Sequence, residues 1–187
     1  MRKFFLLLSA CVLAACTPAT AASTSTPVPP TATEAPPPLM LTSSAFKHEE
    51  SIPVIYSCDG EDTSPELTWT EPPAGTQSFV LIMDDPDAGG TWVHWVVYNL
   101  PASARGLNAA IPVDTEINGG GLQGRNSSRI NGYQGPCPPS GTHRYFFKLY
   151  ALDITLDLPA GAHNVEVTVG MKNHVLASAE LMGTFER

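Results

Sequence analysis

The sequence is poor in cations and in long hydrophobic runs. Its 187 residues include 10 Lys and Arg against 18 Asp and Glu, which gives a net charge of −8 at pH 7. Nucleic-acid binding needs Lys and Arg to neutralise phosphates, so that class of function is excluded. The longest apolar run, Phe4 to Ala15, is shorter than the roughly 20 residues of a membrane-spanning helix.

The amino terminus instead has the features of an export signal. Arg2 and Lys3 precede the apolar run, as in a secretory signal peptide. The run ends in Leu13–Ala14–Ala15–Cys16, which resembles the lipobox of bacterial lipoproteins, where cleavage before the cysteine precedes its lipidation. We predict a signal peptide over 1–15 and a lipid anchor at Cys16, hence an exported protein on a bacterial envelope membrane. The alternative is an ordinary signal peptide cleaved nearby, with Cys16 incidental.

Removal of residues 1–15 would make the chain more acidic. Eight Lys and Arg would remain against eighteen Asp and Glu, a net charge of −10. Anionic lipid attracts basic segments, not acidic surfaces. Contact with the membrane is therefore expected through the lipid anchor alone.

Cysteine is also scarce, with four residues in the chain. Cys11 would leave with the signal peptide and Cys16 would be lipidated, which leaves Cys58 and Cys137. Two cysteines in an exported domain favour a disulfide. The alternative is a pair of buried free thiols.

Composition divides the rest of the chain into two parts. Residues 17–40 are mostly Pro, Thr, Ala and Ser, with Glu34 as the one charge. Such a segment cannot bury enough apolar surface to fold, so residues 16–40 are predicted to be a disordered tether. Residues 41–187 have the composition of one globular domain.

The globular part shows short apolar runs separated by Pro and Gly, with no internal repeat. One run, Trp92–Asn99, is apolar on both faces and should be a central strand. Lys172–Leu181 is predicted as a helix. Strands are predicted at Leu67–Trp69, Phe79–Met83, Trp92–Asn99, Tyr145–Leu152, Val165–Val169 and Leu181–Phe185. This pattern indicates an all-β, antiparallel sandwich with one or two short helices near the C-terminus.

Two adjacent carboxylates, Asp84 and Asp85, follow the run Phe79–Met83. Pro86 and Asp87 then suit a turn, because Pro presets φ and Asp caps the turn backbone. Counting by two places Asp85 on the face of Phe79, Leu81 and Met83, and Asp84 on the other face. A carboxylate at the rim of an apolar face needs a partner.

His94 is the candidate partner of Asp85 across that turn. Strand alternation predicts one face that carries Trp92, His94, Val96 and Tyr98. A carboxylate raises the pKa of a nearby imidazole and fixes its tautomer, so the ring can donate to an anion. Asp85 would thus orient the histidine and not bind the anion itself. The alternative is a hydrogen-bonded core histidine without function.

A second histidine, His143, follows a loop rich in Gly and Pro over 133–145. The strand that begins there carries His143, Tyr145 and Phe147 on one face. The loop is expected to leave backbone N–H groups near Gly135 and Gly141 free to face an anion.

Five motifs occur in order along the globular part. They are C-D-G-x-D-x-S-P-x-L-x-W (58–69), D-P-D-A (85–88), W-V-H-W-V-V-Y-N-L-P (92–101), G-P-C-P-P-x-G-x-H-R-Y (135–145) and H-V-L-A-x-A-E-L-x-G-T-F (174–185). They resemble the phosphatidylethanolamine-binding protein family, and the first resembles its bacterial, Raf-kinase-inhibitor-like branch. The resemblance runs from about Leu41 to the C-terminus.

The resemblance implies an antiparallel β-sandwich with a small anion site at one end. Residues that match the family's ligand-pocket positions are Asp85, Trp92, His94, Gly135, His143 and Tyr145. Residues that match structural positions are Pro86, Asp87, Pro136 and Arg144, and we expect Arg144 to pair with Asp87 and lock the turn. The family's pocket binds phosphate or phosphorylated head groups such as phosphoethanolamine, which implies binding without catalysis, cofactor or metal. The chain lacks the C-terminal extension of eukaryotic members, so eukaryotic-type regulation is not expected.

Three other functions are alternatives to anion binding: inhibition of a partner protein, hydrolysis and zinc binding. The family's links to inhibition suggest an inhibitor of a secreted or periplasmic protease or another partner protein, although no inhibitory loop is visible. A hydrolase could use the Asp85, His94 and His143 cluster, but no G-x-S-x-G elbow occurs and Ser64 and Ser140 adjoin prolines. The same cluster has ligand types for zinc without the spacing of a zinc motif.

Overall fold

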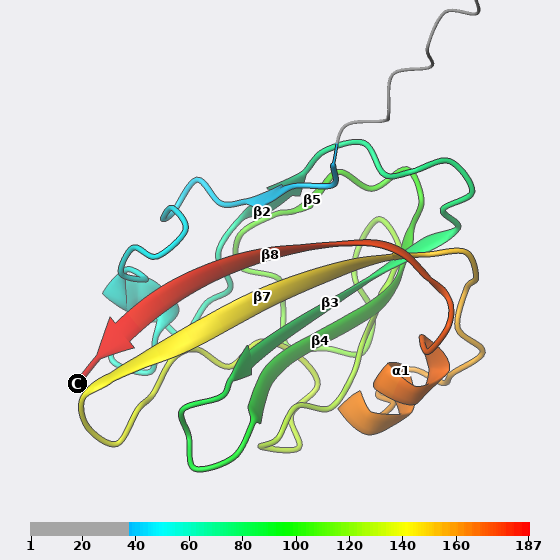
Figure 1. Ribbon diagram of the computed structural model, residues 1–187. Helices are drawn as coiled ribbons and strands as arrows, with labels where there is room; N and C mark the ends of the chain where they lie inside the picture. The colour runs from blue at the N-terminus through cyan, green and yellow to red at the C-terminus, as the bar shows by residue number, and fades with distance from the viewer. Residues whose placement is uncertain (1–37) are drawn as a thin grey trace, which may run out of the picture. The chain divides into compact units, whose positions relative to one another are not determined.

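The computed structural model describes residues 38–187 (Figure 1). The predicted signal peptide, the lipidation site Cys16 and the tether up to residue 37 lie outside the described residues. Leu39 is already buried in the hydrophobic core, and the Met40 N–H donates to Thr70 Oγ1 at 2.9 Å. The folded domain therefore begins slightly before residue 41.

Two antiparallel sheets form the domain, which confirms the predicted all-β sandwich. The smaller sheet has the strand order β1 (Leu41–Thr42), β2 (Leu67–Trp69) and β5 (Gly106–Leu107). The larger sheet has the order β6 (Leu122–Gln123), β4 (Trp92–Pro101), β3 (Ser78–Asp85), β7 (Thr142–Leu152) and β8 (Val175–Glu186). A 3₁₀ turn, η1 (Val54–Tyr56), and one helix, α1 (Asn164–Gly170), complete the described elements.

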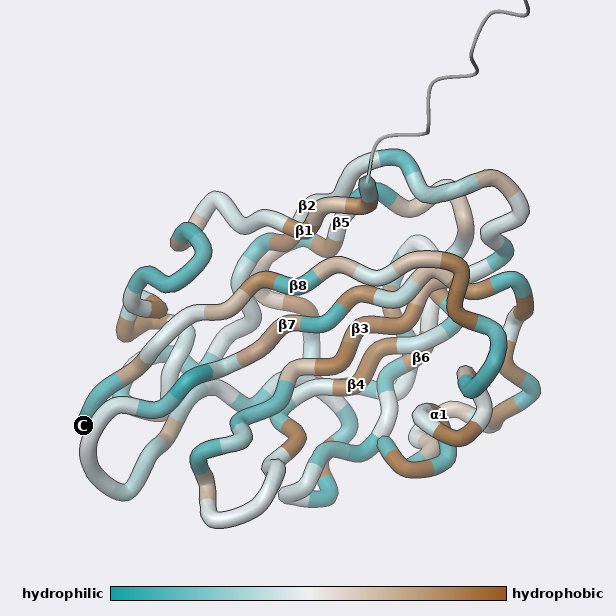
Figure 2. The backbone as a smooth tube through the Cα atoms, viewed as in Figure 1, coloured by the Kyte–Doolittle hydropathy of each residue, from teal (hydrophilic) through white to brown (hydrophobic). Residues whose placement is uncertain are grey.

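The larger sheet is covered on both faces. One face packs on the smaller sheet through a core that includes Phe79, Leu81 and Phe147 from the large sheet and Leu67 and Trp69 from the small one. The other face packs against α1 and its neighbouring loops through Val80, Val96, Tyr98 and Val167. Accordingly β4 is buried from Val93 to Tyr98, as predicted for a central strand. Figure 2 shows the hydrophobic colour over much of β3 and on parts of β4.

The predicted strand Val165–Val169 is wrong, because these residues form most of α1. Their alternating apolar pattern imitates a strand, yet Val165 and Val169 are exposed and Val167 is buried. The Glu166 side chain accepts a hydrogen bond from the His163 N–H at 2.7 Å. This bond satisfies a backbone donor at the start of the helix and so favours helical over extended backbone.

The predicted helix Lys172–Leu181 is also wrong. Residues 175–181 form the start of β8, which continues through the predicted strand Leu181–Phe185. β8 pairs with β7 from Leu152↔Val175 to Thr142↔Glu186. Ala, Leu and Glu favour helix in isolation, but this long pairing decides the structure. The two ribbons run side by side in Figure 1.

Candidate functional site

A cavity of about 300 Å³ opens at the end of the large sheet where β3 ends and β4 and β7 begin. Three segments line it: the β3–β4 turn with the start of β4, the loop 134–139, and the start of β7. The ten lining residues are Asp85, Ala88, Trp92, His94, Gln134, Cys137, Pro138, Pro139, His143 and Tyr145. Five of the six predicted ligand-binding residues are thus brought together, and the sixth, Gly135, is not in the lining.

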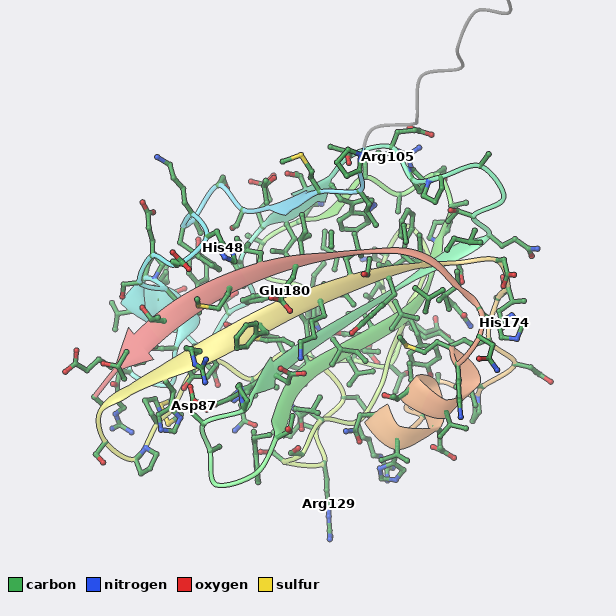
Figure 3. All side chains as sticks on the ribbon, in the orientation of Figure 1. His48, Asp87, Arg105, Arg129, His174 and Glu180 are labelled. Carbon is green, nitrogen blue, oxygen red and sulfur yellow. A yellow bond between two sulfur atoms is a disulfide. The ribbon has the colours of Figure 1, made fainter. Side chains whose placement is uncertain are left out.

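A slightly larger groove of about 380 Å³ lies between β1 and β8. Its walls are mainly apolar side chains such as Leu41, Phe46 and Leu181, and Figure 3 labels His48 and Glu180 on its lining. Ligand sites combine apolar walls with a few convergent polar groups. The smaller cavity, with two imidazoles and a buried carboxylate, meets that description better.

His143, and not His94, is the partner of Asp85. The Nδ1 of His143 lies 2.7 Å from Asp85 Oδ2, while Asp85 Oδ1 accepts the Asp87 N–H at 2.8 Å. Both carboxylate oxygens are therefore engaged within the protein. Asp85 orients an imidazole, as predicted, but the prediction named the wrong one. With Nδ1 of His143 held, its Nε2 is left for the pocket.

His94 is held by a backbone carbonyl. Its Nδ1 donates to the Gln134 carbonyl at 2.8 Å, and its side chain is 5% exposed. Burial lowers the pKa of His94, and the opposing effects of the Gln134 carbonyl and the Asp85 charge only partly compensate. The predicted rise in its pKa is therefore wrong, and His94 is a neutral imidazole near pH 7.

A β-bulge turns His94 toward the cavity. Met83 pairs with Trp95 and Asp84 pairs with Val93, so His94 is an extra residue on β4. Beyond the bulge, Trp95 and Val97 face the inter-sheet core while Val96 and Tyr98 face α1. The predicted single face for Trp92, His94, Val96 and Tyr98 is wrong for this reason, because a bulge shifts strand alternation by one residue.

Tyr145 adds a buried hydroxyl that lies near the Asp85 carboxylate and the Cys137 backbone. Its ring packs edge-on against His94, with centroids 5.2 Å apart, and its side chain is fully buried. Its Oη is one of two buried side-chain polar atoms in residues 38–187 that make no hydrogen bond. Burial and then the negative charge of Asp85 raise the pKa of Tyr145, so the phenol stays protonated. A buried hydroxyl left unpaired costs about 1–3 kcal/mol, which a hydrogen-bonding ligand would recover.

The turn between β3 and β4 is locked by Asp87 and Arg144, as expected. Asp87 Oδ2 accepts from the backbone N–H and Nε of Arg144, both at 3.0 Å, and Oδ1 accepts from Nη2 at 2.7 Å. These bonds lower the pKa of Asp87 to about 2. Asp84 points to the opposite face from Asp85 and pairs with Lys148 at 2.6 Å, which confirms the predicted alternation. Figure 3 shows Asp87 just beyond the end of β3.

A disulfide and hydrogen bonds attach the loop 133–137 to residues 56–62. The predicted disulfide joins Cys58 and Cys137, and the Cys58 N–H donates to the Pro136 carbonyl at 3.1 Å. The Gly135 N–H donates to Asp62 Oδ1 at 2.6 Å. A Cβ at position 135 would lie 2.2 Å from the Tyr56 carbonyl oxygen, so this close approach requires glycine.

The predicted anion-facing backbone N–H groups are wrong. Gly135 donates to Asp62, and the Gly141 N–H donates to the Arg187 carbonyl at 2.7 Å. Sequence reasoning also missed the roles of Gln134 and Asp62. Gln134 acts through its carbonyl, which leaves no side-chain signal, whereas Asp62 stands in the C-D-G-x-D motif and could have been singled out there.

Two kinds of feature are missing from residues 38–187. No group of three or more His, Cys, Asp or Glu side chains is arranged to hold a metal ion. No helix in the same range is long and apolar enough to cross a membrane.

Comparison with known proteins identifies relatives along nearly the whole domain. A UPF0098 protein of Methanothermobacter thermautotrophicus is 47% identical over 148 residues, which are 79% of this chain and 98% of the relative. A UPF0098 protein of Aquifex aeolicus is 48% identical over 149 residues, 78% of this chain and 86% of the relative. A Mycobacterium tuberculosis protein, LppC, which its name proposes as a lipoprotein, is 42% identical over 152 residues, 80% of this chain and 73% of the relative.

Solved structures show the same fold. A Chlamydia trachomatis protein proposed as a phosphatidylethanolamine-binding protein homologue superposes with a TM-score of 0.74 at 39% identity. Escherichia coli YbcL, described as a member of the mammalian family, gives 0.73 at 32% identity. Each comparison covers 80% of this chain and 98% of the other. The family model for phosphatidylethanolamine-binding proteins matches residues 42–186. The chain therefore belongs to the phosphatidylethanolamine-binding protein family.

Proposed function

We propose that this protein is an extracytoplasmic, membrane-tethered binding protein whose pocket holds a small anion without turning it over. The ligand is phosphate or a phosphorylated head group such as phosphoethanolamine. The observation that carries the proposal is the buried, unpaired Tyr145 hydroxyl in a cavity that His94 and His143 also line. A ligand with several acceptor oxygens would pair with all three groups.

The two imidazoles are set up to donate to such a ligand. Each is fixed through Nδ1, His143 by Asp85 and His94 by the Gln134 carbonyl, which leaves each Nε2 for the pocket. The Asp85 carboxylate fixes the orientation and the tautomer of the His143 ring. His94 is neutral and must take up a proton to donate from Nε2, so anion binding is coupled to proton uptake.

The lining favours binding over catalysis. Of its ten residues, none is Ser, Thr or Lys, Cys137 is in a disulfide, and both Asp85 oxygens are engaged. Nucleophilic catalysis needs an activated nucleophile beside a base, and these groups do not offer one. The volume of about 300 Å³ is at the small end for ligand pockets and suits a head group.

The proposal is tested by calorimetric titration with phosphate and with phosphoethanolamine. The wild type should bind, and His143→Ala should bind roughly tenfold or more weakly, because a hydrogen bond to a charged group is lost. His174→Ala is the matched control, since His174 Nδ1 pairs with Asp153 Oδ1 at 2.8 Å outside the pocket. Figure 3 shows His174 near α1, at the other end of the sheet from Asp87. No binding by the wild type, or equal binding by His143→Ala, contradicts the proposal.

The anchored location rests on separate support. The lipobox-like tetrapeptide ends at Cys16, and the relative LppC carries a name that proposes a lipoprotein. Several acyl chains on one cysteine would give stable anchoring, which one chain alone does not.

A further inference from the structure

The peptide group between Gln134 and Gly135 links a second carboxylate to His94. Its carbonyl accepts the His94 Nδ1–H at 2.8 Å, and its N–H donates to Asp62 Oδ1 at 2.6 Å. Hydrogen bonds in a chain polarise one another, so a carboxylate on the N–H makes the carbonyl a stronger acceptor. Each of the two pocket histidines is thus linked by hydrogen bonds to an aspartate, His143 directly to Asp85 and His94 to Asp62 through one peptide group.

We propose that Asp62 is a positioning residue for His94, which it orients and supplies with negative charge through the Gln134–Gly135 peptide group. The inference deepens the proposed function, on which its meaning for ligand binding rests. It also gives a role to an acidic residue of the C-D-G-x-D motif that lies outside the pocket lining.

The backbone supports a specific role for Asp62. Its φ of 54° lies in the left-handed region, where residues other than Gly are uncommon but Asp and Asn are tolerated. On the other side of the contact, an ideal Cβ at Gly135 would meet Asp62 Oδ1 at 2.7 Å. Both positions are therefore constrained so that this carboxylate can reach this N–H.

Several titratable groups surround His94 and must be separated in a test. Asp85 at the end of β3, and His143 and Tyr145 on β7, line the same cavity. Burial lowers the pKa of His94, while the charges of Asp85 and Asp62 both act to raise it. Removal of the Asp62 charge should therefore lower the pKa of His94 further, without any contact with the ligand.

The experiment follows the His94 ring by nuclear magnetic resonance in ligand-free full-length protein. Asp62→Asn keeps an oxygen acceptor and tolerates the left-handed backbone, so it removes the charge alone. We expect a lower His94 pKa, and sulfate binding weaker by about fivefold near pH 6, the scale of one hydrogen bond. Asp59→Asn is the control, because it removes an equal charge from the same segment but pairs with Arg187 at 3.0 Å.

Two results with the variants would overturn the inference. One is a His94 titration in Asp62→Asn that coincides with the wild-type curve, and the other is an equal shift in Asp59→Asn. The wild type gives an independent check if a variant does not fold. In the wild type, the chemical shift of the Gly135 amide proton should lie far downfield and should change with pH at the midpoint of the His94 titration. An ordinary chemical shift that does not change at that midpoint contradicts the inference. Because His94 is titrated without ligand, this result is separate from whether the pocket binds an anion.

Discussion

His94 and His143 are held at the same ring nitrogen by acceptors of different charge. A carboxylate holds His143, and a neutral carbonyl holds the more deeply buried His94. An anion in the pocket would favour the imidazolium form of His94. A change in protonation on binding is therefore expected at His94, since burial keeps it neutral in the free protein.

Anion binding should therefore strengthen as pH falls toward the lowered pKa of His94. The His94 pKa is lowered in the free protein and would rise when the anion binds. Between those two values the affinity should change by up to about tenfold per pH unit, the slope for one proton. Calorimetry with sulfate between pH 5 and 8 measures this, because sulfate keeps its charge over that range. His94→Gln should flatten the profile, and an unchanged slope in that variant would refute the role of His94.

The Asp87–Arg144 pair predicts a second pH effect, on stability. The folded pKa of Asp87 is about 2, below the ordinary value of 3.8. A lowered carboxyl pKa stabilises the fold above about pH 3.8, and this contribution is lost as pH falls toward 2. Arg144→Ala should return the Asp87 pKa toward 3.8 in an NMR titration. It should also reduce the loss of stability between these pH values in urea unfolding. An Asp87 titration that does not move in Arg144→Ala argues against the pair.

Residue types and the alternation of side chains along strands predict much of the pocket, and the remainder depends on tertiary contacts. The prediction that Asp85 shares a face with the apolar side chains of β3 is confirmed. The choice of His94 as its partner is wrong, because the distance from β3 to β7 across the sheet is not visible in the sequence. The neutral state of His94 follows from its burial, which depends on tertiary contacts such as the one with the Gln134 carbonyl.

Two secondary-structure features form the pocket: the β-bulge in β4 and the loop 134–139, which a disulfide attaches to the rest of the domain. The bulge re-aims His94, and the Cys58–Cys137 disulfide holds the loop that supplies the Gln134 carbonyl. Bulges often re-aim side chains next to functional sites. The positions of the pocket side chains thus depend on the bulge and on the disulfide-bonded loop, and not only on regular strand pairing.

Loss of the disulfide should weaken both folding and binding. It closes a separation of 79 residues, and removal of such a bond costs about 2–5 kcal/mol. Urea unfolding of a Cys58→Ser, Cys137→Ser double variant measures the first effect, and phosphate titration of the still-folded variant measures the second. An unfolding free energy equal to that of the oxidised wild type would contradict this role.

The strands β2, β3, β4 and β7 were predictable, whereas the two-residue strands β1, β5 and β6, the helix α1 and the start of β8 were not. β2 matches its predicted bounds, and β3, β4 and β7 extend theirs by one to three residues. Their apolar runs are long and bounded by Pro or Gly, so local pattern and tertiary structure agree. In α1 and at the start of β8, local pattern and tertiary structure disagree. The hydrogen bond from the His163 N–H to Glu166 favours the helix in α1, and pairing with β7 favours the strand in β8.

For the whole molecule, the proposed function joins a head-group pocket to a lipid anchor through a tether. The domain fold and its family are shown, whereas the anchor at Cys16 and the tether remain predictions outside the described residues. An acidic domain on a Pro-rich tether would sample ligands near the membrane without adhering to anionic lipid.

Replacement of Cys16 tests the anchor. Wild-type protein expressed in a bacterium should incorporate radiolabelled palmitate and partition into the detergent phase, because several acyl chains bind membrane stably. Cys16→Ala should lose the label and appear in the aqueous phase. Cys58→Ser should keep the label, since the lipidated cysteine is another one. Label retained by Cys16→Ala would exclude the predicted site.

A crystal structure of the wild type soaked in phosphate tests anion binding in this pocket most directly. We expect one tetrahedral anion in the cavity at the end of β3, within hydrogen-bond distance of Nε2 of His94, Nε2 of His143 and Oη of Tyr145. Those three atoms are the polar atoms that the protein leaves for a ligand, and Nε2 of His94 donates once that ring has taken up a proton. A cavity that holds only water at saturating phosphate, or an anion bound only elsewhere on the domain, would show that this pocket is not an anion site.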